Sequence, residues 1–173
     1  MPDPQKHSDD RNWIESIGRK IPGFRGYLER GYRREADHLL RESIAERLQR
    51  SKSGIDDYLR QLVNAAQLDG LTEIERIRTR LDTLIGKIRA QVRGASGFFD
   101  FVRVDEEKLD QAYALDMQLH EQTESLAEAI EALSTPKGGD DSPAAIAADL
   151  IRKIDDAETQ LECREDLLQG VGE

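Results

Sequence analysis

Residues 39–62 have the sequence LLRESIAERLQRSKSGIDDYLRQL, in which mostly apolar residues recur at alternating steps of four and three. Such steps place side chains on one face of an α-helix, because the helix turns once every 3.6 residues. We call this line of residues the seam of the helix. Its members are Leu40, Ile44, Leu48, Ser51, Ile55, Tyr58 and Leu62. The seam predicts a long amphipathic helix that must bury one face against other helices.

The seam passes through Gly54 without losing its register. A break there is an alternative, because glycine weakens a helix interior and Ser53 with Asp56 resembles the start of a new helix. We expect one helix over residues 28–68, about 60 Å long at about 1.5 Å per residue. The Asp69-Gly70 pair that follows is typical of a turn.

Three further segments have the same periodicity and predict helices over residues 71–93, 105–134 and 143–168. Ser142 is a suitable N-cap for the last one, with Pro143 at its first position. A shorter amphipathic stretch around Trp13 predicts an N-terminal helix over residues 11–20. The three seams are Leu71, Ile74, Ile77, Leu81, Leu84, Ile85, Ile88 and Val92; Leu109, Ala112, Asp116, Leu119, Thr123, Leu126, Ile130 and Leu133; and Ile146, Leu150, Ile154, Ala157, Leu161 and Leu168.

Together these segments predict an all-α fold, an elongated antiparallel helical bundle with coiled-coil-like packing and a short N-terminal helix. We expect residues 11–169 to form a single domain. Residues 1–10 are polar and contain two prolines, so they are expected to be a disordered tail, and residues 170–173 a frayed one.

Charge is distributed unevenly along the 173 residues. Residues 1–94 carry 19 basic and 15 acidic side chains, a net +4, whereas residues 95–173 carry 6 and 20, a net −14. The overall charge of −10 makes nucleic acid an unlikely partner, because phosphate binding needs clustered lysines and arginines. The asymmetry predicts that the two halves attract each other, within one molecule or between molecules.

A single cysteine, Cys163, can form no internal disulfide, and the first residues contain no apolar run typical of a signal peptide. No segment approaches the roughly 20 apolar residues of a spanning helix. We therefore expect a cytoplasmic protein, with a peripheral position on the inner face of the membrane as the alternative.

No complete catalytic constellation is present in the sequence. Cys163 lies among acidic residues, which disfavour a reactive thiolate, and no histidine is near it in the sequence. The phosphate-binding GxxxxGK[ST] loop is also absent, and no GxGxxG turn follows a strand. We expect no catalytic residue, no cofactor and no enzymatic activity.

A metal centre is the motif-based alternative. Glu35 and His38 form a Glu-x-x-His pair, which in di-iron bundles places two ligands on one helix face. The second pair such a centre needs is incomplete, because Met117 stands where a glutamate is required before His120. The substitute set would be Asp116, His120 and Glu124. We expect no metal, and keep a carboxylate/histidine metal-binding bundle as the second alternative function.

Two surface motifs favour binding. The first interleaves arginines with tyrosines, a combination that holds phosphates or anionic headgroups, and consists of Arg25, Tyr27, Arg30, Tyr32, Arg33 and Arg34. Arg41, Arg47 and Arg50 continue it. Nearby glutamates favour a solvated face with ion pairs instead. The second motif is Phe98, Phe99 and Phe101, which predict either an apolar interaction loop or a connector that closes the end of the bundle.

Two stretches of this sequence also resemble a known group of proteins. They are IPGFRGYLERGYRREADHLLRESIAERL at residues 21–48 and GASGFFDFVRVDEEKLDQAYALD at residues 94–116. Together they resemble uncharacterised bacterial helical proteins with a PGxRGY start, an RREAD-type helix and an FDxVKVDE-type connector, here with Arg103 at the lysine. The resemblance covers residues 21–133. It implies association with SPFH-type membrane-scaffold proteins, and no activity.

These observations lead to a ranked set of functions. The first is a non-enzymatic helical scaffold or adaptor that binds a protein partner through helix–helix contacts and self-associates, based on the length of the two best seams. The alternative is a peripheral protein on an anionic membrane surface, using the Trp13 helix, residues 25–34 and the loop at 98–101.

Overall fold

The computed structural model describes residues 19, 33–94, 106–134 and 142–169. Four long α-helices make up most of this part: α3 (Arg33–Asn64), α4 (Leu71–Gly94), α6 (Glu106–Glu131) and α7 (Pro143–Gln169). Two short 3-10 helices, η1 (Leu68–Gly70) and η2 (Ala132–Ser134), follow α3 and α6. No strand occurs among the described residues, so the predicted all-α bundle is confirmed. The predicted tails and the N-terminal helix, apart from Arg19, lie outside them.

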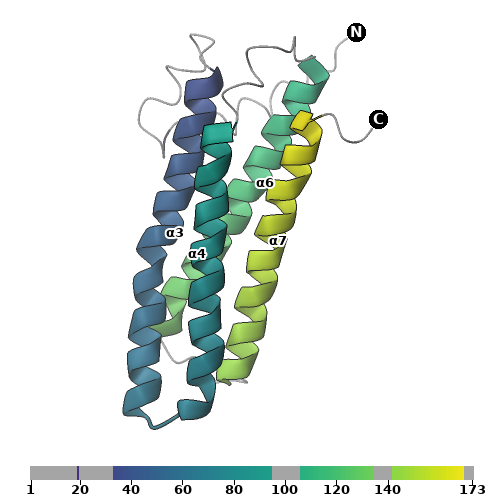
Figure 1. Cartoon of the computed structure of the whole chain (residues 1–173). Helices are drawn as coiled ribbons and strands as arrows, with labels where there is room; N and C mark the ends of the chain where they lie inside the picture. The colour runs from purple at the N-terminus through teal and green to yellow at the C-terminus, as the bar shows by residue number, and fades with distance from the viewer. Residues whose placement is uncertain (1–18, 20–32, 95–105, 135–141, 170–173) are drawn as a thin grey trace.

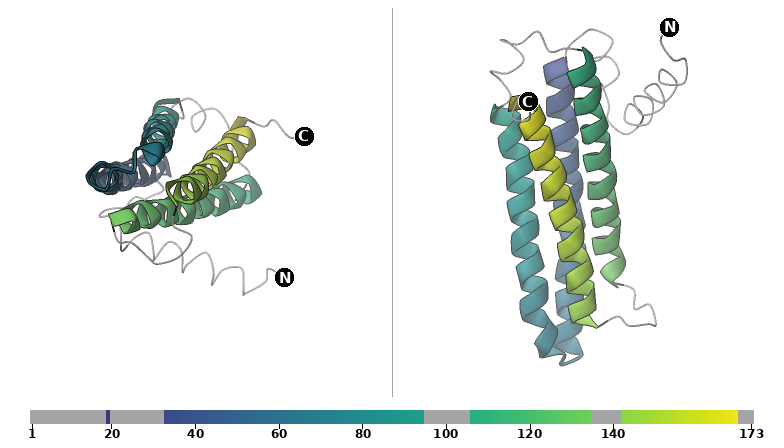
Figure 2. Two further views of the ribbon diagram at one scale, coloured as in Figure 1. Left: turned by 90° about the horizontal axis from the view of Figure 1, so that it is seen from below. Right: turned by 90° about the vertical axis from the view of Figure 1, so that its right-hand side faces the viewer.

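The helices form two antiparallel hairpins, α3–α4 and α6–α7, that lie against each other (Figure 1). Around the bundle the neighbours follow the order α3, α4, α7, α6, which places α3 diagonally opposite α7 (Figure 2). Contacts between hairpins rise together in residue number. Between α3 and α6, Arg41 meets Asp116 and Arg47 meets Glu124, and between α4 and α7, Arg80 meets Asp155 and Gln91 meets Glu165. Neighbouring helices of different hairpins therefore run parallel. The predicted antiparallel packing holds within each hairpin and along the diagonals.

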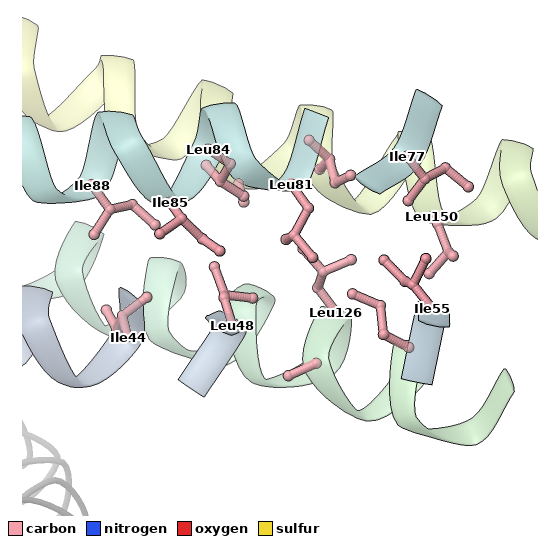
Figure 3. Packing of buried hydrophobic residues seen from close by; sticks show 14 of the residues in the cluster. Ile44, Leu48, Ile55, Ile77, Leu81, Leu84, Ile85, Ile88, Leu126 and Leu150 are labelled. Carbon is pink, nitrogen blue, oxygen red and sulfur yellow. The ribbon is translucent and has the colours of Figure 1, made fainter. Parts of the chain in front are cut away.

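The seams of all four helices converge on one apolar core (Figure 3). Every residue of the seam that begins at Leu40 is buried, including the polar Ser51. Ser51 is satisfied inside its own helix, since its hydroxyl donates to the Leu48 carbonyl. The remaining helices contribute isoleucines and leucines at the predicted positions, among them Ile74, Ile77, Leu81, Leu84, Ile88, Leu119, Leu126, Ile130, Leu150, Ile154 and Leu161.

Helix α3 continues without interruption through Gly54, so the alternative of a break at this residue is wrong. Glycine is required there by a close approach of α3 to α6. A Cβ atom at position 54 would lie 2.4 Å from the Ile130 carbonyl oxygen, inside any ordinary contact distance. The residue that looked like a helix breaker is therefore the point where the two helices pack backbone to backbone.

The reversal between α3 and α4 begins earlier than predicted, because α3 ends at Asn64 rather than at residue 68. Ala66 adopts a left-handed backbone with φ 56°, and the Gln67 amide donates to the Leu62 carbonyl at 2.9 Å. Such a left-handed residue after a helix satisfies its last carbonyls, but glycine or asparagine is the usual choice. An alanine gives no such signal in the sequence. Gly70 instead provides space for Pro143, which a Cβ would meet at 2.4 Å.

Ala66→Gly is expected to raise the free energy of unfolding by about 0.5–1 kcal/mol. The left-handed conformation costs an alanine roughly 1–2 kcal/mol, part of which is offset by the greater freedom of glycine in the unfolded chain. Ala66 is exposed, so no packing is lost. Urea denaturation measures the change, with Ala65→Gly in the adjacent turn residue as the control. An unchanged or lower stability for Ala66→Gly would contradict this expectation.

Helix α7 begins where the sequence predicts it, directly after Ser142. The Ala145 amide donates to the Ser142 hydroxyl at 3.2 Å, and the Ile146 amide donates to the Ser142 carbonyl at 3.0 Å. These bonds satisfy amides that have no partner inside the helix. The predicted N-cap at Ser142 is confirmed.

Candidate functional site

Four charged side chains meet inside the bundle, where apolar residues are the norm. Asp37 and Arg41 come from α3, Asp116 from α6 and Arg164 from α7. Arg41 is fully buried, and Asp116 and Arg164 are each 4% exposed. We call these four residues the buried ion network. Charged residues are almost never buried unless they are paired, so this network is the least ordinary feature of the described structure.

Every contact in the network joins an arginine to a carboxylate. Asp116 Oδ1 lies against Arg41 Nη2 and 2.6 Å from Arg164 Nε. Arg164 Nη2 also donates to Asp37 Oδ1, and Arg41 Nε lies 3.7 Å from the same oxygen. Because α3 and α7 are diagonal neighbours, the Arg164–Asp37 contact crosses the centre of the bundle. Two positive and two negative charges balance, so the network is neutral as a whole.

Burial dominates the energetics of these groups. It raises the pKa of the Asp116 carboxyl, although Arg41 and Arg164 oppose the rise by stabilising the carboxylate. Burial likewise lowers the pKa of Arg41, against the attraction of Asp116. Burial also disfavours charge on Arg164, but Asp116 and Asp37 outweigh it and its pKa is raised. For Arg41 and Asp116, the attraction of the oppositely charged partners therefore offsets only part of the free energy that burial of the charge costs.

Arg41 also has hydrogen-bonding capacity that its partners leave unused. Its Nη1 is buried and has no hydrogen-bond acceptor among the described residues. A buried donor without a partner forfeits the bonds it would make with water, at about 1–3 kcal/mol. The network therefore joins three helices in a defined way but is a poor means of maximising stability.

The sequence contains a signal for this network that we did not recognise. Asp116 belongs to the seam of its helix, and Arg164 occupies the seam position between Leu161 and Leu168. Asp37 lies one seam step before Leu40, and Arg41 flanks that leucine. Opposite charges at seam positions of helices expected to pack together predict a buried ion pair. Arg41 was assigned to a basic surface instead, and the structure contradicts that assignment because Arg41 is buried.

The network lies beside the described apolar core. Three seam leucines lie directly beside it, each three residues from a network member: Leu40, Leu119 and Leu161. Ala112, four residues on the other side of Asp116, is buried but does not belong to the contiguous cluster. The network lies toward the end of the bundle where α3 and α6 begin and α4 and α7 end (Figure 1), called the terminal end here.

Further ion pairs connect the two hairpins on the surface. Arg47 of α3 forms a fork with Glu124 and Glu131 of α6, at 3.1 and 2.6 Å. Arg80 and Lys87 of α4 both contact Glu158 of α7, at 3.0 and 3.1 Å. The positive and negative halves of the chain therefore attract each other within one molecule. Arg47 is part of this attraction and so is not the solvated anion-binding residue that the basic stretch suggested.

Glu131→Gln is expected to lower stability by less than about 1 kcal/mol at pH 7, because the pair is exposed. Hydrogen bonds from Arg47 lower the pKa of Glu131. A group with a lowered pKa in the folded state stabilises the fold above the unfolded pKa of about 4.3, and this stability is lost as the pH falls. The difference from the wild type should therefore shrink progressively in urea titrations as the pH falls below the unfolded pKa of about 4.3. Glu128→Gln on the same helix is the control, and a difference that persists at acidic pH would contradict the assignment.

The described members of the predicted metal-ligand set do not gather into a site. The described residues contain no group of three or more histidine, cysteine, aspartate or glutamate side chains that could hold a metal ion. His38 is exposed, Asp116 is held by arginines and Glu124 is paired with Arg47. The side chain of Glu35 lies outside the described part. Nothing in this geometry fits a di-iron or zinc centre.

Most residues of the two predicted surface motifs lie outside the described ranges. They are Arg25, Tyr27, Arg30 and Tyr32 of the basic stretch and Phe98, Phe99 and Phe101 of the loop. Arg33 and Arg34 begin α3, but their side chains are also outside them. Cys163 is exposed on α7, next to the buried Arg164.

A shallow groove of about 270 Å³ lies between α6 and α7. It is lined by polar and charged side chains of both signs, Glu121, Gln122, Ser125, Arg152, Lys153 and Asp156. The lining contains no histidine or cysteine, and Lys153 donates to the Ser125 hydroxyl at 2.9 Å. Apart from this Lys153–Ser125 contact, the lining contains no nucleophile paired with a base.

Comparison of this sequence with protein-family models, with curated proteins and with solved structures found no match. Among the described helices, none is both long and apolar enough to cross a lipid bilayer. The fold and the network define the class: an elongated four-helix bundle of two hairpins that contains a buried ion network.

Proposed function

We propose that this chain is a non-enzymatic helical adaptor that acts through helix–helix contacts with a protein partner. The buried ion network is the observation that carries the proposal. Apolar replacements of such networks are often neutral or stabilising, so a bundle that needed only stability would not require one. A buried network does specify which helices meet and in what register, which an adaptor needs in order to present a defined surface.

The long seams no longer argue for self-association. They are buried within a single chain, and the large apolar residues exposed among the described ones are limited to Val63 and Leu68. A second copy that used the described outer faces would therefore bind through a mainly polar surface. The favoured partner of the adaptor is therefore a different protein, and a second copy of this chain is the next candidate. The adaptor would act in the cytoplasm.

Chemical crosslinking followed by affinity purification from the native host tests the adaptor function. The bait is the full-length chain, and an unrelated four-helix bundle of similar charge is the control. We expect crosslinks between one enriched protein and outer-face residues of α6 or α7, such as Lys153. Light scattering after size exclusion at low and high salt gives the oligomeric state. A strict monomer at both salt concentrations, with no protein enriched over the control, would overturn the proposal.

The peripheral membrane function has lost part of its support. Arg41 and Arg47, which extended the basic stretch, are engaged with carboxylates inside and between the hairpins. The remaining basic and aromatic residues of that hypothesis lie outside the described ranges. Flotation with anionic and neutral vesicles separates the two functions, because an adaptor without membrane affinity is recovered equally poorly with both.

A further inference from the structure

We draw no further inference here: the strongest candidate, the buried ion network toward the terminal end of the bundle, belongs to the site already described, and nothing among the described residues shows a ligand or a partner that it would receive.

Discussion

Asp116→Ala is expected to lower the free energy of unfolding by about 3–5 kcal/mol, the largest effect of any single substitution considered for this chain. The carboxylate is the acceptor shared by Arg41 and Arg164, both of which are buried. Its removal leaves two guanidinium groups inside the bundle with Asp37 as the remaining counter-ion. Equilibrium urea denaturation, followed by far-UV circular dichroism, measures the loss.

The matched control is Asp82→Ala, which removes the carboxylate of an ion pair with Lys52 on the surface. Asp82 is about half exposed, and pairs of this kind contribute about 0–1 kcal/mol. Losses of similar size at positions 82 and 116 would show that the network is not buried as described. A quadruple replacement of Asp37, Arg41, Asp116 and Arg164 by leucine should be far less harmful than Asp116→Ala alone, because it removes every member of the network and leaves no pair half broken.

Gly54→Ala is expected to lower the free energy of unfolding by about 3 kcal/mol, although alanine is the better helix former. The added methyl group would lie 2.4 Å from the Ile130 carbonyl oxygen and 2.9 Å from its carbonyl carbon. Both atoms belong to the backbone of α6, so they cannot rotate away as a side chain can. Relief requires α3 and α6 to separate, which loosens the seams on either side.

Gly86→Ala makes the same chemical change in another helix interior and should have the opposite sign. No heavy atom lies within 4 Å of the Cβ position at residue 86. The substitution is therefore expected to stabilise the protein by about 0.5–1 kcal/mol through helix propensity alone. Thermal and urea denaturation of both variants decides the matter. A stabilising Gly54→Ala would mean that α3 and α6 do not approach as closely as described.

Periodicity was sufficient to predict which faces of the helices are buried. The seam from Leu40 to Leu62 was identified from spacing alone, since a helix of that length must hide its apolar face. Spacing could not predict which helices become neighbours, because apolar seams pack against one another with little preference. Opposite charges do join the parallel neighbours, through Arg47 between α3 and α6 and through Arg80 between α4 and α7.

The remaining differences between the predicted and the observed structure arise at residues that deviate from common sequence patterns. Gly54 suggested a break because glycine is a poor helix former, which can be read from the sequence. The close approach of the Ile130 carbonyl, which requires a glycine at this position, appears only in the folded structure. Ala66 gave no turn signal, because alanine rarely adopts a left-handed conformation. Asp116 was found as a seam residue, but its arginine partners lie 75 and 48 positions away, and only the packed bundle brings them together.

The position of the buried ion network also determines how the bundle would respond to mechanical force. The start of α3 and the end of α7 lie at the same end of the molecule, where the network is found (Figure 1). Tension applied between these two points would peel the helices apart sequentially, as in unzipping, rather than slide them past one another in shear. The Arg164–Asp37 contact, which joins these two helices across the diagonal, would bear the load first. A pull on the start of α3 and the end of α7 would thus act first on the buried ion network, while the apolar layers near the turn between α3 and α4 would be loaded only after those ions had separated.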